Sequence, residues 1–121
     1  EDLISTCLAE NSAHVVYSTR DVAKGKPART AYQVLRETEA FSLLRVELLT
    51  GRKHQIRVHL SEMGHAVVGD KKYGPKERGR SRLALHARSI TFRHPFNGRF
   101  LTIEARVPRY FETLVGAIEG C

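Results

Sequence analysis

The chain is organised around one polar stretch, residues 50–60 (TGRKHQIRVHL). No other segment gathers cationic, polar and imidazole side chains so densely. A β-like run ends just before it, and Thr50 is a residue type that caps the N-termini of helices. We therefore predict a helix over residues 52–63, with Gly64 as its left-handed C-terminal cap.

The predicted helix has two faces of different character. One apolar stripe follows the helical spacing and is expected to pack on a core: Ile56, Leu60 and Met63. The other side carries His54, Arg57 and Ser61, which are left free to face a cleft. The stretch is thus predicted to hold a cationic surface against the body of the domain.

Length and composition indicate a single globular domain. The chain has 121 residues, of which 41% are hydrophobic and 27% are charged. No apolar run approaches the ~20 residues needed to cross a bilayer, and no signal peptide is visible. Cys7 and Cys121 have no recognisable spacing and are interpreted as free thiols of a reducing compartment, so the cytoplasm is the expected location.

The charge balance favours a polyanionic partner. Lysine and arginine number 20 against 13 acidic residues, which gives a formal net charge of +7. Fourteen of the twenty are arginine, whose guanidinium suits bidentate phosphate contacts and stacking on bases. A nucleic acid is the expected partner, although charge alone does not separate RNA from DNA or from simple solubility.

The rest of the sequence predicts short strands joined by turns. Strand-like runs occupy residues 14–17, 28–36, 41–49, 67–68, 83–87, 89–94 and 100–106, whereas residues 1–13 carry weak signals. Runs 28–36 and 41–49 form one predicted hairpin, and the last two runs form another through an Asn97-Gly98 turn. A second helix is predicted over residues 108–118, with Phe111, Leu114, Val115 and Ile118 buried. The predicted fold class is α+β, a mostly antiparallel mixed sheet with two helices.

Three ordered motifs resemble one known family. GRKHQIRVH (residues 51–59), GHAVVGDKKYG (64–74) and RLALHA (82–87) are similar to TGRxHQIRxH, GHPIxGDxxYG and RLxLHA of the RluA-type ribosomal RNA pseudouridine synthases. The resemblance extends from GKPARTAY (25–32) to VPRYF (107–111). Ala66 stands where the family usually has proline, which we interpret as a minor loop change.

The resemblance implies an enzyme that isomerises uridine in RNA, with the pseudouridine synthase catalytic fold. Such enzymes use an aspartate on a uridine flipped out of its stack, and no metal or organic cofactor takes part. An arginine beside the aspartate holds it ionised and in place. Its counterpart here is Arg57, the arginine of HQIR, whereas Asp70 of the GDxxYG motif is assigned to turn geometry.

The nucleophile itself has no counterpart in this sequence. The family's aspartate lies in an HRLDxxTSG-like segment, and Asp2, Asp21 and Asp70 all lack that context. Residues 1–121 are therefore expected to be the C-terminal half of a pseudouridine synthase catalytic domain. Such a fragment would be inactive alone.

RNA contacts are expected from two places. Arg52, Lys53, His54 and Gln55 cluster at the start of the predicted helix, where free N–H groups and the helix dipole favour a phosphate. By resemblance, Leu85 and His86 line the uracil pocket, although spacing alone would make Leu85 a core residue. The basic loop over residues 71–82 is either a backbone-phosphate contact or a solvated loop.

A zinc site and a non-catalytic binding module are the two alternatives to this enzyme. A zinc site could be drawn from His54, His59, His65 and Asp70, but positions 54 and 59 lie about 140° apart on a helix, so no metal is expected. A non-catalytic basic RNA-binding module is the alternative function, since it needs no nucleophile. The expected partner is ribosomal RNA, with no DNA or membrane, and the expected state is a monomer.

Overall fold

The computed structural model describes residues 2–75, 82–93 and 95–116, which form two compact units, Glu1–Leu83 and Ala84–Cys121. The first unit holds strands β1 (Asp2–Glu10), β2 (Val16–Thr19), β3 (Lys26–Glu37) and β4 (Ser42–Leu48), followed by helix α1 (Gln55–Glu62). The second unit holds β5 (Ser89–Arg93), β6 (Phe100–Glu104) and helix α2 (Arg109–Val115). The predicted α+β class is confirmed, with two antiparallel sheets among the described residues in place of one mixed sheet.

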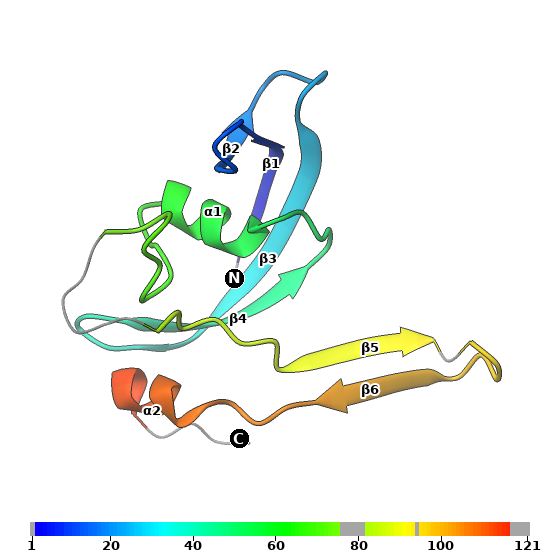
Figure 1. The fold of residues 1–121 in the computed structure, drawn as a ribbon. Coiled ribbons are helices and arrows are strands. Elements are labelled where there is room, and N and C mark those ends of the chain that lie inside the picture. The colour runs from blue at the N-terminus through cyan, green and yellow to red at the C-terminus, as the bar shows by residue number, and fades with distance from the viewer. Residues whose placement is uncertain (1, 76–81, 94, 117–121) are drawn as a thin grey trace. The chain divides into compact units, whose positions relative to one another are not determined.

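The first unit is a four-stranded sheet with α1 against one face (Figure 1). Its strand order is β2-β1-β3-β4, and every neighbouring pair is antiparallel. Side chains alternate between the two faces of a strand, so even-numbered residues of β1 and β3 point to the same side. That side forms the core, in which Leu8, Val16, Ala28 and Val58 are buried.

Both predicted hairpins are present. β3 pairs with β4, and the register of this pair shifts between Val34 and Arg36. β5 pairs with β6. Gly98 has a φ of 68°, the positive value that favours glycine in a tight turn. The strands predicted over residues 67–68 and 83–87 are wrong, because both segments are turns or irregular backbone. β1 was not predicted at all.

Helix α1 begins later than predicted. Its N-cap is His54, with a φ of 55°, so Thr50 is not the cap and the helix starts at Gln55. The buried side consists of Gln55, Val58, His59 and Leu60, whereas Met63 of the predicted stripe is 39% exposed. The predicted apolar stripe is therefore only partly right.

The C-terminal cap of α1 was predicted correctly. Gly64 has a φ of 84°, and its N–H donates to the carbonyl of Ser61 while the N–H of His65 donates to that of Leu60. These two bonds form a Schellman motif. In the second unit, α2 begins after Pro108 as expected and ends at Val115, with Val115 buried; Ile118 lies outside the described residues. Neither α1 nor α2 is long and apolar enough to cross a membrane.

Candidate functional site

Arg57 and Asp70 form a bidentate ion pair between α1 and the loop that follows it. The Nε–H of Arg57 donates to Oδ2 of Asp70 at 3.0 Å, and Nη2–H donates to Oδ1 at 2.8 Å. The Asp70 side chain is fully buried, whereas the Arg57 side chain is 19% exposed. Arg57 lies on α1 and Asp70 in the turn after Gly69, so the pair joins the helix to the following loop.

The turn that carries Asp70 is built around its carboxylate. Oδ1 also accepts the backbone N–H groups of Lys72 and Tyr73, both at 3.1 Å. Burial by itself raises the pKa of Asp70, but the hydrogen bonds from Arg57, Tyr73 and Lys72 outweigh it and hold the pKa below its usual value. The same pair raises the pKa of Arg57, so both groups are charged. The structure thus gives Asp70 the predicted turn geometry and, in addition, a charged partner.

Tyr73 ties the Arg57 side chain to the rest of the unit. The guanidinium carbon of Arg57 lies 5.1 Å from the centre of its ring, within cation–π range. Its hydroxyl accepts the N–H of Val16 at 3.1 Å and is hydrogen-bonded to Nδ1 of His54 at 2.7 Å. The Ser61 hydroxyl donates to its carbonyl. Tyr73 therefore fixes the loop against both α1 and β2.

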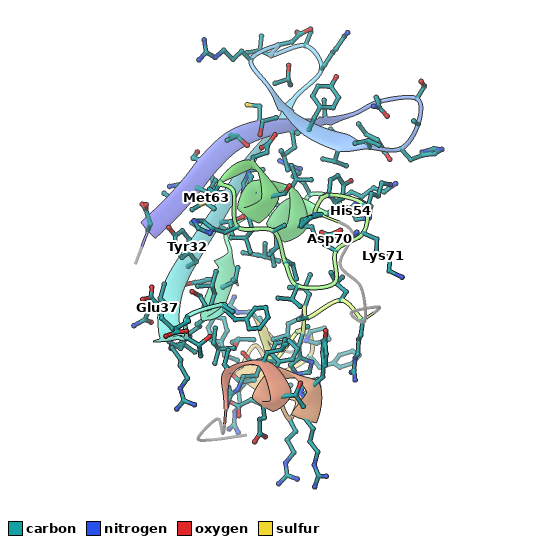
Figure 2. All side chains as sticks on the ribbon, turned by 90° about the vertical axis from the view of Figure 1, so that its left-hand side faces the viewer. Tyr32, Glu37, His54, Met63, Asp70 and Lys71 are labelled. Atoms are coloured by element: carbon teal, nitrogen blue, oxygen red, sulfur yellow. The ribbon has the colours of Figure 1, made fainter. Side chains whose placement is uncertain are left out.

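His54 stands at the edge of this arrangement. Figure 2 shows His54 and Asp70 near the same end of α1, with Met63 at the other end. Burial and then the positive charges of Arg57, Lys72 and Lys53 lower the pKa of His54, so its ring is neutral at physiological pH. His54 contributes a hydrogen-bonding ring to the site, not a cation.

One edge of the Arg57 guanidinium is hydrogen-bonded to Asp70, whereas the other edge has no acceptor among the described residues. Asp70 takes Nε–H and one Nη2–H, which leaves two N–H groups on Nη1 and one on Nη2. Within the described part of the chain, no hydrogen-bond acceptor is found for these three. A second carboxylate or a phosphate is the group that such an edge binds best.

Gln55, expected to contact RNA, is a structural residue here. It is only 3% exposed. Its Nε2 donates to the carbonyl of Arg29 and to Oγ1 of Thr30, each at 2.9 Å. Its Oε1 accepts the Thr50 hydroxyl at 2.8 Å and the Arg52 N–H at 2.9 Å. All four hydrogen-bonding positions of the amide are used inside the protein, and none is left for RNA.

A buried histidine completes the attachment of α1 to the sheet. His59 is 1% exposed, and its ring nitrogens are hydrogen-bonded to Oγ1 of Thr6 on β1 at 2.9 Å and of Thr30 on β3 at 2.8 Å. Burial lowers its pKa, which keeps the ring neutral. Since both nitrogens are used, His59 has none left for a metal, and no group of three or more metal-ligating side chains gathers among the residues described.

Arg52 and Lys53, the other predicted RNA contacts, are exposed. Nε of Arg52 donates to the carbonyl of Pro27 at 2.8 Å. Nζ of Lys53 lies 2.6 Å from the Glu10 carboxylate, and its side chain is 51% exposed. Exposed ion pairs of this kind stabilise a fold little, so Lys53 can exchange its partner for a phosphate.

Leu85 and His86 belong to the second unit and are described within it. Leu85 is 39% exposed, so it is not the buried residue that a core strand would need. The His86 ring lies edge-on to Phe111, with 6.4 Å between the ring centres. Loop residues 76–81 lie outside the described part of the chain, so the two interpretations of that basic loop stay predictions.

Comparisons with known proteins agree on one family. The family described as RNA pseudouridylate synthase matches residues 1–62, about half of the chain. Ribosomal large subunit pseudouridine synthase D of Nitrosomonas europaea is 41% identical over 118 residues, which cover 88% of this chain and 34% of that protein. Ribosomal large subunit pseudouridine synthase C of Pasteurella multocida is 38% identical over 102 residues, covering 78% and 31%.

A solved structure supports the same assignment. Human RNA pseudouridylate synthase domain containing 1 aligns with a TM-score of 0.72 at 31% identity, covering 93% of this chain and 50% of that one. The chain spans about a third of the length of the curated relatives it matches. Together with the motifs around Arg57, these matches show that the chain belongs to the RluA-type RNA pseudouridine synthase family.

Proposed function

We propose that this chain supplies the arginine side of an RNA pseudouridine synthase active site, and that the full-length protein isomerises uridine in ribosomal RNA. The observation that carries the proposal is Arg57, a guanidinium fixed along one edge and carrying three further N–H groups. Membership of the family supports the reaction, and the names of the curated relatives support ribosomal RNA as the substrate.

In the proposed reaction Arg57 acts on an aspartate from outside residues 1–121. A guanidinium within hydrogen-bond range favours the carboxylate form and fixes its direction. That carboxylate assists cleavage of the N-glycosidic bond of a flipped-out uridine. The uracil turns, its C5 bonds to the same ribose carbon, the C5 proton leaves and N1 gains a proton. Asp70 does not take that aspartate's place, since it is buried and paired with Arg57.

RNA binding is proposed to rest on the exposed cations of the same region. Arg52 and Lys53 would contact phosphates, and His54 would present its neutral ring beside them. Leu85 and His86 are retained as proposed pocket residues on the strength of the RLALHA motif. We further propose that the protein is a cytoplasmic monomer that binds neither DNA nor membranes.

The test is an isomerisation assay on RNA carrying tritium at uracil C5. The label is released when C5 becomes the glycosidic carbon, so its release reports the reaction directly. The full-length protein is expected to release tritium, and the 121-residue chain is expected to bind the RNA in a salt-dependent way without releasing any. Binding without release by the full-length protein would indicate a non-catalytic RNA-binding module instead.

A further inference from the structure

Both oxygens of the Asp70 carboxylate are hydrogen-bonded. Its Oδ1 accepts three hydrogen bonds, from Nη2 of Arg57 and from the backbone N–H groups of Lys72 and Tyr73, and its Oδ2 accepts Nε of Arg57. The side chain has no exposed surface. Such a group cannot reach a ribose or a uracil ring, so its role is exerted through its partners.

The turn by itself does not need a charged residue. The two backbone N–H groups both donate to Oδ1, and the side-chain oxygen of an asparagine could accept them in the same way. Only a carboxylate can also accept Nε–H and Nη2–H of Arg57 side by side. Burying a charge is costly unless it is paired, so the charge of Asp70 is best explained by Arg57.

The pair also determines which part of Arg57 is available. With Nε and one side of Nη2 held by Asp70 and the ring of Tyr73 5.1 Å from the guanidinium carbon, the guanidinium has little freedom to turn. The unoccupied N–H groups, on Nη1 and the outer side of Nη2, therefore point in a fixed direction. A second carboxylate that binds this edge meets a donor already in place.

We propose that Asp70 is a positioning residue for the isomerisation: it holds Arg57 so that the opposite guanidinium edge receives the reacting aspartate. This inference rests on the proposed role of Arg57. In addition to shaping the turn, Asp70 would affect the rate of the reaction through its ion pair with Arg57. A residue of this kind affects the chemical step and leaves RNA affinity unchanged, because the phosphate contacts lie on other side chains.

The test compares Asp70→Asn with Asp21→Asn in the full-length protein. The two are matched, because Asp21 also caps a turn through its side chain, accepting the N–H of Ala23 at 2.9 Å, but it is exposed and pairs with no arginine among the described residues. Melting temperature, kcat per folded molecule and KM for the RNA are measured for each. We expect Asp70→Asn to lower kcat by about 10- to 100-fold with KM within about twofold, since small displacements of a positioned group cost rate. Asp21→Asn should leave both constants at the wild-type values.

A second variant covers the case in which Asp70→Asn does not fold. Asp70→Glu keeps the charge, but its side chain is one methylene longer and would shift the guanidinium of Arg57. It should therefore lower kcat, as Asp70→Asn does. Arg57→Ala is measured alongside and is expected to be inactive. Given that result, a wild-type kcat in Asp70→Asn overturns the inference. If only Asp70→Glu folds, a wild-type kcat in that variant overturns it. If Arg57→Ala is itself as active as the wild type, the proposed role of Arg57 has failed instead, and the two failures are thereby told apart.

Discussion

The buried amide of Gln55 offers a measurable test of how α1 is held. Replacing it by methionine, Gln55→Met, keeps an unbranched side chain of similar volume and removes all four hydrogen bonds. Two partners keep another bond: the Arg29 carbonyl still accepts the N–H of Leu49, and Thr30 still bonds to His59. The Thr50 hydroxyl and the Arg52 N–H lose their acceptor.

The size of the loss follows from this count. Each neutral hydrogen bond contributes about 0.5–1.5 kcal/mol net, and water can replace part of what the two partly exposed donors lose. We therefore expect Gln55→Met to lower the free energy of unfolding by about 2–3 kcal/mol, a melting temperature lower by roughly 10 °C for a chain of this size. Urea and thermal unfolding followed by circular dichroism measure both quantities.

The matched control is Gln33→Met, because Gln33 is exposed on β3 and bears the same side chain. It should change the free energy of unfolding by less than about 0.5 kcal/mol. Equal and small losses in the two variants would refute the reasoning, since they would mean that the amide of Gln55 does not hold α1 to the sheet.

Two further predictions concern stability. Lowering the pH from 7.5 to 5.5 should reduce the melting temperature: burial depresses the pKa of His59, so the stability it contributes is complete above the unfolded value of about 6.5 and is lost as the pH falls. His59→Gln should weaken this dependence and the exposed His65→Gln should not; an unchanged slope in His59→Gln would contradict the assignment. Gly69→Ala should be far more destabilising in urea than Gly64→Ala, because both have φ near 80° but only at Gly69 would the new Cβ lie 1.9 Å from a carbonyl oxygen, that of Arg82. Similar losses, near the 1–2 kcal/mol of backbone strain alone, would show that this close approach is not present in solution.

The elements predicted from sequence were those with local signals. The β3–β4 and β5–β6 hairpins follow from alternation and turn residues, and the cap at Gly64 follows from its place after a helical period. β1 was missed because its inward side chains include the polar, half-buried Thr6, whose hydrogen-bond partners include His59 of α1. No pattern within β1 itself indicates that partner.

The candidate site also contains residues that local sequence reveals and residues whose roles depend on distant partners. Arg57 could be found from its motif, whereas its pairing with Asp70 joins residues 13 apart across a loop and depends on the left-handed turn at Gly69. Gln55 was assigned to RNA because its neighbours are cationic. Its burial depends on Arg29, Thr30 and Thr50, which come from other parts of the chain, so spacing within the motif could not reveal it.

The most direct test of the central claim replaces Arg57 by lysine in the full-length protein and measures the single-turnover rate of tritium release at saturating RNA. Arg57→Lys keeps the positive charge but cannot bind two carboxylates through two edges, so the rate should fall by about 100-fold or more. Arg45→Lys, at an exposed position of β4, is the matched control and should stay within about twofold of the wild type, with RNA affinity unchanged in both. A wild-type rate in Arg57→Lys would contradict the claim that the guanidinium of Arg57 positions the reacting aspartate.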